Sequence, residues 1–325
     1  MFRAIVVAED LPAALTEIDD DSLPDAEVSI DVLFSSINYK DGLALRGKGS
    51  IVRTLPLVPG IDLVGTVTAS KSPRFTPGDR VVLNGDGIGE TRFGGLAERA
   101  KVRPDALLLL PRAITPERAA AIGTAGFAAM IAVLALGDAE VSPSDGPVLV
   151  TGAAGGVGSI AIALLAARGY TVTASTGRLE EHGAYLRTLG ASDVIDRAEF
   201  SEPGKPLQTQ RFAGAIDSVG SATLANVLAQ TKYKGTVVAC GLAQGSDLPV
   251  TVLPFILRAV TLTGANSVNA PIELRERAWA ALAEELDGVL LDSMTTTVGL
   301  AEVFGVADRI LAGTVRGRTV VDVRR

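Results

Sequence analysis

Short runs of apolar and β-branched residues, separated by polar turns, fill the first third of the chain. Residues 28–34, 62–69 and 80–83 are such runs, and Pro/Gly turns at 58–60 and 76–78 punctuate the pattern. Short runs of this kind bounded by turn residues are typical of β-strands. We therefore predict a mostly β domain over residues 1–118.

After Pro116 the pattern changes to long apolar helical stretches that alternate with strand-like runs. The runs are residues 148–151, 169–174, 193–195, 213–218, 236–239 and 260–264. Strands alternating with helices predict a doubly wound parallel sheet, here over residues 119–294. A last strand at 318–323 is expected to return residues 295–325 to the first domain, so the fold class is α/β with two domains.

Composition and net charge limit the kinds of protein and partner that fit this chain. Of the 325 residues, 47% are hydrophobic and 21% charged, which is typical of a globular protein. The net charge of −7, with no run rich in Lys or Arg, argues against nucleic acid and anionic membranes as partners. The N-terminus reads as a strand and not as a signal peptide, and Gly123, Thr124 and Gly126 interrupt the apolar stretch 119–136. We expect that stretch to be a buried helix, and the protein to be cytoplasmic.

One cysteine, Cys240, and one histidine, His182, occur in the whole chain. An intrachain disulfide needs two cysteines, and a Cys/His zinc site needs several ligands. No metal is therefore expected, and catalysis by a Cys-His pair or a Ser-His-Asp triad is disfavoured.

The sharpest motif is the glycine-rich segment Thr151-Gly152-Ala153-Ala154-Gly155-Gly156-Val157-Gly158-Ser159. It follows an apolar strand and opens a helical run, which is the setting of a dinucleotide pyrophosphate site. Glycine lets the backbone approach the pyrophosphate, and free N–H groups at the helix start bind the anion. Gly155, Gly156, Val157 and Gly158 are the predicted cofactor residues here.

About 20 residues further on, where NAD-binding domains usually carry an acidic residue, the chain has Ser175-Thr176-Gly177-Arg178. Hydroxyls and a guanidinium suit a 2′-phosphate, so NADPH is predicted over NADH. The alternative is that Arg178 only lies on the surface at a helix start.

Two later strands end in segments that could contact the nicotinamide half of the cofactor, or could be ordinary loops. They are Cys240-Gly241-Leu242 and Asn266-Ser267. Cys240 is expected to be a small buried residue and not a nucleophile, because no base accompanies it in the sequence.

Segments along nearly the whole chain resemble the zinc-free quinone oxidoreductase branch of the medium-chain dehydrogenase/reductases, and within it the acrylyl-CoA reductase group. The more specific ones are Asn38-Tyr39-Lys40-Asp41, Gly47-Lys48-Gly49, Thr176-Gly177-Arg178 and Pro254-Phe255-Ile256-Leu257-Arg258; segments shared more widely include Pro59-Gly60-Ile61-Asp62, Gly123-Thr124-Ala125 and Gly317-Arg318-Thr319. In zinc-dependent relatives a metal-binding Cys occupies the place of Asn38-Tyr39.

The resemblance implies a GroES-like β domain built from both chain ends, a Rossmann domain between them, an active site in the cleft and usually a homodimer. It also implies NADPH-dependent reduction of acrylyl-CoA to propionyl-CoA. Asp41, Thr124 and Arg318 join the expected cofactor residues on this basis.

The implied chemistry is hydride transfer to the β-carbon of an α,β-unsaturated thioester, which places negative charge on the thioester oxygen. Asn38 and Tyr39 are candidates to stabilise that oxyanion, and Tyr39 or bulk water could protonate the α-carbon. Both residues could instead be structural turn residues. Asp41 could orient Lys40 or bind the nicotinamide ribose, and Thr124 could lie beneath the nicotinamide or be an N-cap.

Basic residues that could bind the CoA phosphates, or simply form a solvated face, are Lys40, Arg46, Lys48, Arg53 and Arg92. Three other functions stay open: an NADPH-dependent quinone or enal reductase, a non-catalytic NADPH-binding redox sensor and, more remotely, an NAD-linked alcohol dehydrogenase.

Overall fold

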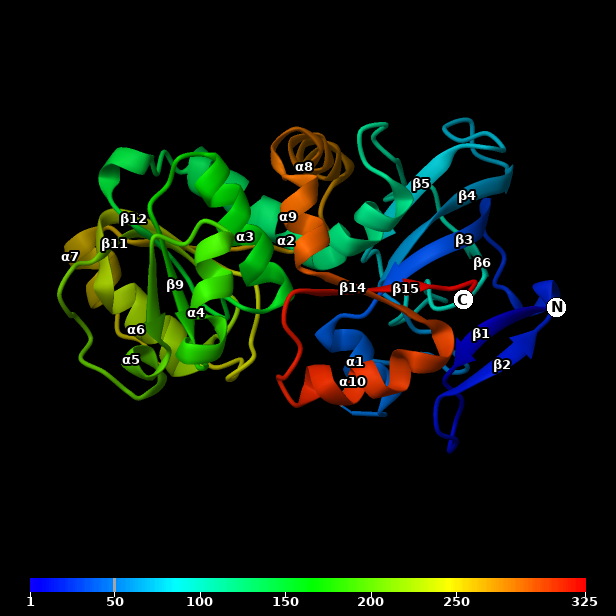
Figure 1. Ribbon diagram of the computed structural model, residues 1–325, viewed down its shortest axis with the longest axis horizontal. Coiled ribbons are helices and arrows are strands. Elements are labelled where there is room, and N and C mark those ends of the chain that lie inside the picture. Colours follow the sequence, from blue (N-terminus) through cyan, green and yellow to red (C-terminus); the bar gives the residue numbers. More distant parts are fainter. Residues whose placement is uncertain (49–50) are drawn as a thin grey trace. The chain divides into compact units, whose positions relative to one another are not determined.

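The computed structural model describes residues 1–48 and 51–325, which divide into two compact units (Figure 1). The first unit holds Met1–Phe127, Ser267–Ala283 and Leu291–Arg325, and the second holds Ala128–Asn266 and Glu284–Leu290. Gly49, the last residue of the predicted Gly47-Lys48-Gly49 motif, lies outside the described residues.

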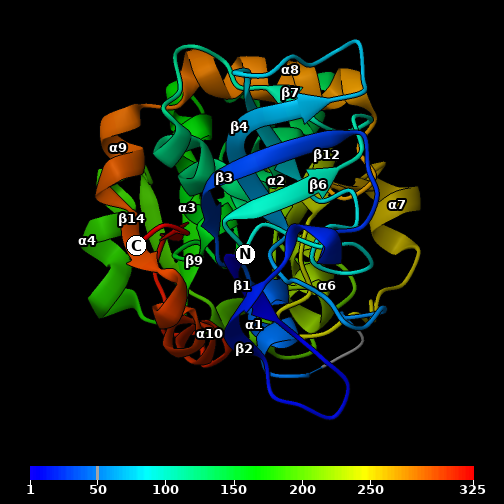
Figure 2. The ribbon, with the colours of Figure 1, turned by 90° about the vertical axis from the view of Figure 1, so that its right-hand side faces the viewer.

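The first unit is built mainly on antiparallel strands, with β14 and β15 pairing in parallel, and its many short strands agree with the mostly β domain that the short apolar runs predict. Its larger sheet has the order β14-β15-β3-β4-β5-β7, and β6 also pairs with β3; β1 and β2 form a separate pair. Figure 2 shows β3, β4 and β6 side by side. The strands are β1 (Phe2–Val6), β2 (Ala14–Ile18), β3 (Val28–Ser36), β4 (Asp62–Ser70), β5 (Arg80–Asn84), β6 (Arg99–Val102), β7 (Leu108–Leu109), β14 (Thr295–Gly299) and β15 (Arg318–Asp322).

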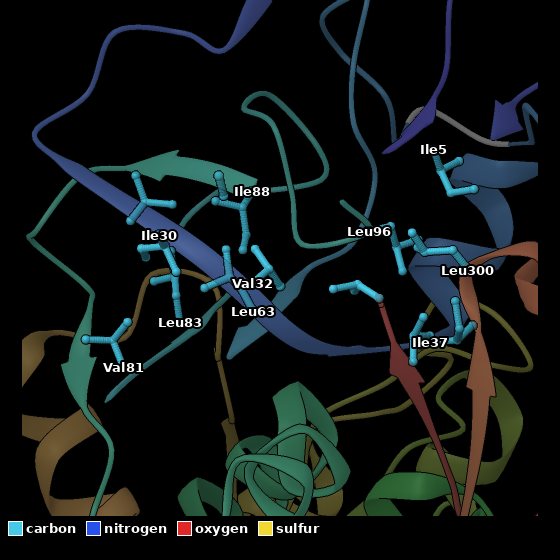
Figure 3. Close-up of a cluster of buried hydrophobic side chains, with 14 of the residues drawn as sticks. Ile5, Ile30, Val32, Ile37, Leu63, Val81, Leu83, Ile88, Leu96 and Leu300 are labelled. Atoms are coloured by element: carbon cyan, nitrogen blue, oxygen red, sulfur yellow. The ribbon is translucent and has the colours of Figure 1, made fainter. Parts of the chain in front are cut away.

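Alternation along β3 shows why this sheet forms. Val28, Ile30 and Val32 are at most 1% exposed, whereas Ser29 and Asp31 between them are partly exposed. Successive side chains of a strand point to opposite faces, so one face of β3 lies in the core. Figure 3 shows Ile30 and Val32 in one cluster with Leu63 of β4, the adjacent strand, and Leu83 of β5, the strand beyond it.

The first unit also contains helices, which are α1 (Tyr39–Leu45), α8 (Ile272–Glu285) for most of its length, α9 (Gly288–Ser293) in part and α10 (Val303–Leu311). Helix α10 packs on α1 (Figure 1). Arg46, at the end of α1, donates to the Asp308 carboxylate of α10 at 2.6 and 2.7 Å. Strand β15 pairs antiparallel with β3, so the end of the chain completes a sheet begun near its start.

The second unit is a six-stranded parallel sheet with the order β10-β9-β8-β11-β12-β13, which confirms the predicted α/β fold class. The order reverses between β8 and β11, where sheets of this kind open a crevice at the carboxyl ends of the strands. Its strands are β8 (Val148–Val150), β9 (Val172–Thr176), β10 (Asp193–Asp196), β11 (Phe212–Asp217), β12 (Thr231–Ala239) and β13 (Thr261–Gly264). Its helices are α3 (Gly156–Ala167), α4 (Leu179–Thr188), α5 (Ala198–Ser201), α6 (Ser221–Gln230) and α7 (Leu253–Arg258).

The predicted domain boundaries at 118/119 and 294/295 differ from the units observed. The first boundary falls between Phe127 and Ala128, inside α2 (Pro116–Asp138), and most of α8 groups with the first unit. Hydrogen bonds explain the grouping of α8: Trp279 of α8 donates to the Asn84 side chain at 3.2 Å, and Arg275 donates to the Asn84 carbonyl at 2.6 Å. Such long-range polar contacts leave no periodic signal in the sequence.

Helix α2 passes a length and composition test for a membrane span, yet 89% of its most apolar window is buried inside the protein. This burial agrees with the core helix that we expect there. The helix is interrupted at Gly123, whose φ of 48° and ψ of −160° are not helical. A Cβ at Gly123 would lie 2.6 Å from the Asp62 carboxylate and 2.9 Å from the Ser36 hydroxyl.

Replacing Gly123 should therefore destabilise the protein strongly. We expect Gly123→Ala to lower the free energy of unfolding by about 2–4 kcal/mol, because the substitution combines an unfavourable backbone conformation with a close contact in the interior. Chemical denaturation followed by circular dichroism would measure the change.

Gly137→Ala, in the same helix, is the matched control. A Cβ at Gly137 would have no atom nearer than 3.8 Å. It should be neutral or raise the free energy of unfolding by up to about 1 kcal/mol. Equal losses in the two variants would contradict our explanation of the kink.

Candidate functional site

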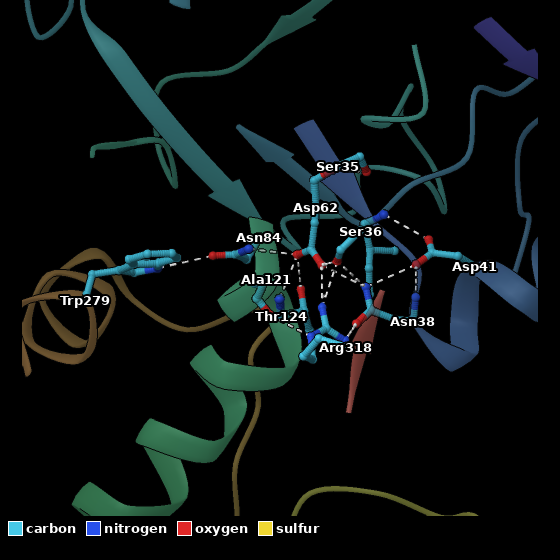
Figure 4. A network of polar contacts seen from close by, with 11 residues as sticks. Ser35, Ser36, Asn38, Asp41, Asp62, Asn84, Ala121, Thr124, Trp279 and Arg318 are labelled. Atoms are coloured by element: carbon cyan, nitrogen blue, oxygen red, sulfur yellow. Dashed lines mark hydrogen bonds and ion pairs between the residues drawn. The ribbon is translucent and has the colours of Figure 1, made fainter. Parts of the chain in front are cut away.

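The first unit contains a buried polar network centred on Asp62, the first residue of β4 (Figure 4). Asp62 is fully buried. Its Oδ1 accepts from the Asn84 side-chain amide at 2.7 Å and from the N–H and hydroxyl of Thr124 at 2.8 and 2.7 Å. Its Oδ2 accepts from the Ser36 hydroxyl at 2.5 Å and from the Asn38 side-chain amide at 2.8 Å. We call these residues, with Arg318, the Asp62 network.

Arg318 supplies the positive charge of the Asp62 network. Its guanidinium is 4% exposed and its Nη2 lies 3.9 Å from the Asp62 carboxylate. It donates to the Ser36 hydroxyl at 2.8 Å, to the Asn38 side-chain oxygen at 3.1 Å and to the Ala121 carbonyl at 2.7 Å. Burial lowers the pKa of Arg318, and Asp62 and Asp41 oppose that shift. This placement does not favour the prediction that Arg318 binds the cofactor, because the guanidinium donates to protein groups.

Asn38 caps the start of α1, and its side chain is fully engaged. The amide nitrogen donates to the carboxylates of Asp62 and Asp41, at 2.8 and 3.1 Å, and the amide oxygen accepts from Arg318. An amide nitrogen has only two N–H donors. The structure therefore argues against the prediction that Asn38 donates a hydrogen bond to an oxyanion and indicates that it positions its neighbours.

Tyr39 differs from Asn38 in being exposed. Its side chain is 50% exposed at the first position of α1, and within residues 1–48 and 51–325 its hydroxyl donates no hydrogen bond. Of the two predicted catalytic residues, it is the one whose polar group remains available to a ligand.

Asp41 is buried beneath Asn38 and does not contact Lys40. Its carboxylate accepts from the backbone N–H groups of Asn38 and Ile61, at 2.7 and 3.0 Å. Lys40 instead forms an ion pair with Glu90 at 2.8 Å. The prediction that Asp41 orients Lys40 is therefore wrong, and its 1% exposure does not favour a cofactor ribose as its partner.

Thr124 directs both its hydroxyl and its N–H to Asp62. Because Gly123 interrupts α2 immediately before it, the residue starts the second part of that helix. The arrangement places Thr124 in the Asp62 network and leaves neither donor for the nicotinamide.

The predicted basic cluster is largely neutralised. Lys40 pairs with Glu90, Arg46 with Asp308, and Arg92 with Asp86 at 3.0 Å. Lys48 and Arg53 are exposed and have no ion-pair partner among the described residues. Metal binding has no support in residues 1–48 and 51–325, where His, Cys, Asp and Glu side chains form no group able to hold an ion.

In the second unit, the glycine-rich segment has the predicted strand, turn and helix. It connects β8 to α3, a helix of 12 residues whose N-cap is Gly155. A Cβ at Gly158 would lie 2.5 Å from the Gly152 carbonyl oxygen, so the helix can approach the turn only with glycine there. The N–H groups of Gly156, Val157 and Gly158 fall in the first turn, where no intrahelical acceptor exists, and can bind an anion.

The predicted 2′-phosphate segment lies at the carboxyl end of β9, the strand next to β8. Ser175 and Thr176 are buried at the strand end, and Arg178 is the half-buried N-cap of α4. Thr176 Oγ1 lies 3.3 Å from His182 Nδ1, and Arg178 Nε lies 3.6 Å from the Glu181 carboxylate. Arg178 thus lies at the helix start, as both interpretations of the sequence required.

The remaining predicted residues follow β12 and β13. Cys240 donates its thiol to the Asp217 carbonyl at 3.2 Å, and burial raises the pKa of this thiol to about 12, which fits a non-nucleophilic role. Gly241 packs on Ser218, whereas Leu242 is 62% exposed. Asn266 ends the long segment of the second unit, and Ser267 begins a segment of the first, with its carbonyl accepting from Arg275 at 3.2 Å.

Several network residues were not predicted from the sequence. Asp62 appeared only within the widely shared segment Pro59-Gly60-Ile61-Asp62, and Ser36 and Asn84 were not singled out. Arg275, which donates to the Asn84 carbonyl, was not singled out either. The signal for Asp62 is its place directly after Val58-Pro59-Gly60-Ile61 at the start of a buried strand, where a carboxylate must find donors.

The comparisons with known proteins agree with both units. Residues 24–112 match the family described as alcohol dehydrogenase GroES-like domain, and residues 156–284 match the one described as zinc-binding dehydrogenase. The acrylyl-CoA reductase AcuI of Ruegeria pomeroyi is 48% identical over 99% of both chains.

Two solved structures are also similar. The yhdH oxidoreductase from Salmonella enterica in complex with NADP is 48% identical, with a TM-score of 0.97 over 99% of this chain and 100% of that one. The Bacillus subtilis protein yhfP with NAD bound is 42% identical, with a TM-score of 0.95 over 99% of both chains. The protein YhfP of Bacillus subtilis is named as a quinone oxidoreductase.

The pKa of Asp41 leads to a test of the buried network. Burial, and next the charge of Asp62, raise the pKa of Asp41 to about 7, against hydrogen bonds from Asn38 and Ile61 that lower it. The folded protein then keeps a proton that the unfolded chain releases near pH 4. The free energy of unfolding should therefore fall as the pH rises from about 4 to about 7, and the loss from this group should level off above that.

Urea denaturation at pH 5 and pH 8 would measure this slope in the wild type and in Asp41→Asn. The variant should lose about 2–3 kcal/mol less between the two pH values, because one proton contributes about 1.4 kcal/mol per pH unit from pH 5 to about pH 7. Asp31→Asn, at a partly exposed position of β3, is the control and should keep the wild-type slope. An unchanged slope in Asp41→Asn would contradict the raised pKa.

Proposed function

This chain belongs to the medium-chain dehydrogenase/reductase family, and we infer from that membership that it is an NADPH-dependent reductase of α,β-unsaturated acyl-CoA. The substrate class is the short enoyl thioester, with acrylyl-CoA reduced to propionyl-CoA. The observation that carries this inference is the 48% identity to an acrylyl-CoA reductase over 99% of both chains. That likeness covers both units.

The cofactor assignment is supported by the second unit. The glycine-rich segment offers first-turn N–H groups for a pyrophosphate, and the end of β9 carries Arg178 where a carboxylate would favour NADH. A similar oxidoreductase was solved with NADP. NADPH, when bound, supplies the hydride that adds to the β-carbon of the substrate.

Within the first unit, the proposed division of labour follows exposure. Tyr39 is the group that contacts the substrate, and its hydroxyl either donates to the thioester oxygen as charge develops there or delivers the proton to the α-carbon. Asn38, Asp41, Thr124 and Arg318 act by holding the start of α1 and the kink of α2 in place. Ser175, Thr176, Gly177, Gly241, Leu242, Asn266 and Ser267 remain proposed cofactor contacts.

A quinone reductase is the second candidate, because the similar Bacillus subtilis protein bears that name. The same hydride chemistry would then act on a small apolar acceptor without a CoA moiety. Lys48 and Arg53, the exposed basic residues near α1, favour the acyl-CoA because the CoA phosphates need positive partners.

Two further properties are proposed with the function. The protein is expected to work in the cytoplasm, where NADPH and acyl-CoA thioesters are found, and to form a homodimer as the resemblance implies. Analytical ultracentrifugation of the purified chain tests the second point directly.

The deciding experiment follows NADPH absorbance with acrylyl-CoA, crotonyl-CoA, acrolein and a benzoquinone, each repeated with NADH. We expect kcat/KM to be highest for acrylyl-CoA with NADPH. Turnover only with the quinone or the enal would replace the acyl-CoA assignment, and NADPH binding without turnover of any acceptor would indicate a redox sensor.

Tyr39→Phe tests the catalytic assignment. Removing the hydroxyl should lower kcat for acrylyl-CoA by roughly 100-fold, the low end of the usual contribution of general acid–base catalysis, and leave the KM for NADPH within about twofold. Tyr233→Phe is the matched control, since Tyr233 is 62% exposed in the second unit. A wild-type kcat in Tyr39→Phe would leave water as the proton donor and remove Tyr39 from the mechanism.

A further inference from the structure

Arg197 lies beside the predicted 2′-phosphate segment, although it is 19 residues beyond Arg178 in the sequence. Strands β9 and β10 are parallel neighbours, with Asp196 opposite Thr176. The Arg197 N–H donates to the Thr176 carbonyl at 3.0 Å. The first residue after β10 is therefore fixed at the same sheet edge as the end of β9.

The side chain of Arg197 lies over the backbone of Gly177. A Cβ built on Gly177 would be 2.7 Å from Cζ and 2.8 Å from Cδ of Arg197, closer than real Cβ atoms approach other groups. The guanidinium thus occupies space that a side chain at position 177 would need. A side chain at position 177 would therefore push the flexible Arg197 side chain away from this turn.

The charges around Gly177 are unequal. Arg178 lies 3.6 Å from the Glu181 carboxylate, so its charge is partly offset. Arg197 is exposed, and across residues 1–48 and 51–325 its guanidinium forms no ion pair and donates to no acceptor. The uncompensated positive charge at this edge of the sheet therefore belongs to Arg197.

We propose that Arg197 is a second determinant of NADPH selectivity, binding the 2′-phosphate together with Arg178. The inference rests on the proposed NADPH site and extends it. A phosphate monoester carries close to two negative charges and three acceptor oxygens, which two guanidinium groups satisfy better than one. Because Glu181 offsets part of the charge of Arg178, the second arginine is needed for a net attraction.

Equilibrium binding tests this role without any acceptor substrate. Dissociation constants for NADPH, NADH and 2′,5′-ADP would be measured by calorimetry for the wild type, Arg197→Ala and Arg187→Ala. Arg197→Ala should weaken NADPH and 2′,5′-ADP by about tenfold and leave NADH within about twofold, because only the first two carry the 2′-phosphate. Arg187 is an exposed arginine of α4 that donates to the Ser192 carbonyl, and its removal should change none of the three.

Gly177→Ala gives an independent test, since its methyl group would displace the Arg197 guanidinium. It should weaken NADPH binding in the wild-type background and add little in the Arg197→Ala background. If the losses of NADPH affinity caused by Gly177→Ala and Arg197→Ala add fully in the double variant, the Gly177 substitution does not act through Arg197.

The remaining outcomes separate this inference from the proposed function. An unchanged affinity of Arg197→Ala for NADPH, or an equal loss for NADPH and NADH, would overturn the inference alone. If Arg197→Ala selectively loses affinity for NADPH and 2′,5′-ADP but the wild-type protein turns over no acceptor, the inference is supported and the reductase assignment is removed. A wild-type chain with no preference for NADPH and 2′,5′-ADP over their unphosphorylated counterparts would overturn both the inference and the NADPH assignment.

Discussion

The fully buried carboxylate of Asp62 constrains the first unit more than any other group. A buried charge is costly unless hydrogen bonds and an opposite charge replace its water. Here the donors come from β3, β5, the N-cap of α1 and the kinked part of α2, and the nearest positive charge comes from β15. Segments more than 250 residues apart must therefore be in place together before this charge is satisfied.

The same constraint determines which residues can act on a ligand. Asn38 was expected to be catalytic and Thr124 to contact the cofactor, yet their donors are used by the two buried carboxylates. Saturated hydrogen-bond donors hold a site rigid but cannot also stabilise a developing charge. Tyr39 follows Asn38 directly in the sequence but is exposed. The buried groups therefore hold the start of α1 in place, and the exposed phenol is the group that can act on a ligand.

How much could be predicted depended on whether the signal was local. The six parallel strands and the turn from β8 to α3 were predictable, because apolar runs and glycine spacing act over neighbouring residues. The role of Asn38 was not, because Asp62 lies 24 residues away and a pattern of residue types does not show which amide meets which carboxylate. That most of α8 groups with the first unit was not predictable for the same reason, since this grouping depends on Arg275 and Trp279 reaching Asn84, 191 and 195 residues distant.

The order of segments in the first unit has a consequence for synthesis on the ribosome. Strand β3 is made early, whereas Arg318 of β15, the strand that is the partner of β3, is made 280 residues after Asn38, to which it donates. At translation rates of about 5–20 residues per second, the early strands wait tens of seconds for that partner. The second unit, made mainly from residues 128–266, has no such delay. During this interval the edge of β3 lacks the strand that pairs with it and Asp62 lacks its nearest positive charge, and an unpaired strand edge favours aggregation of the nascent chain until β15 arrives.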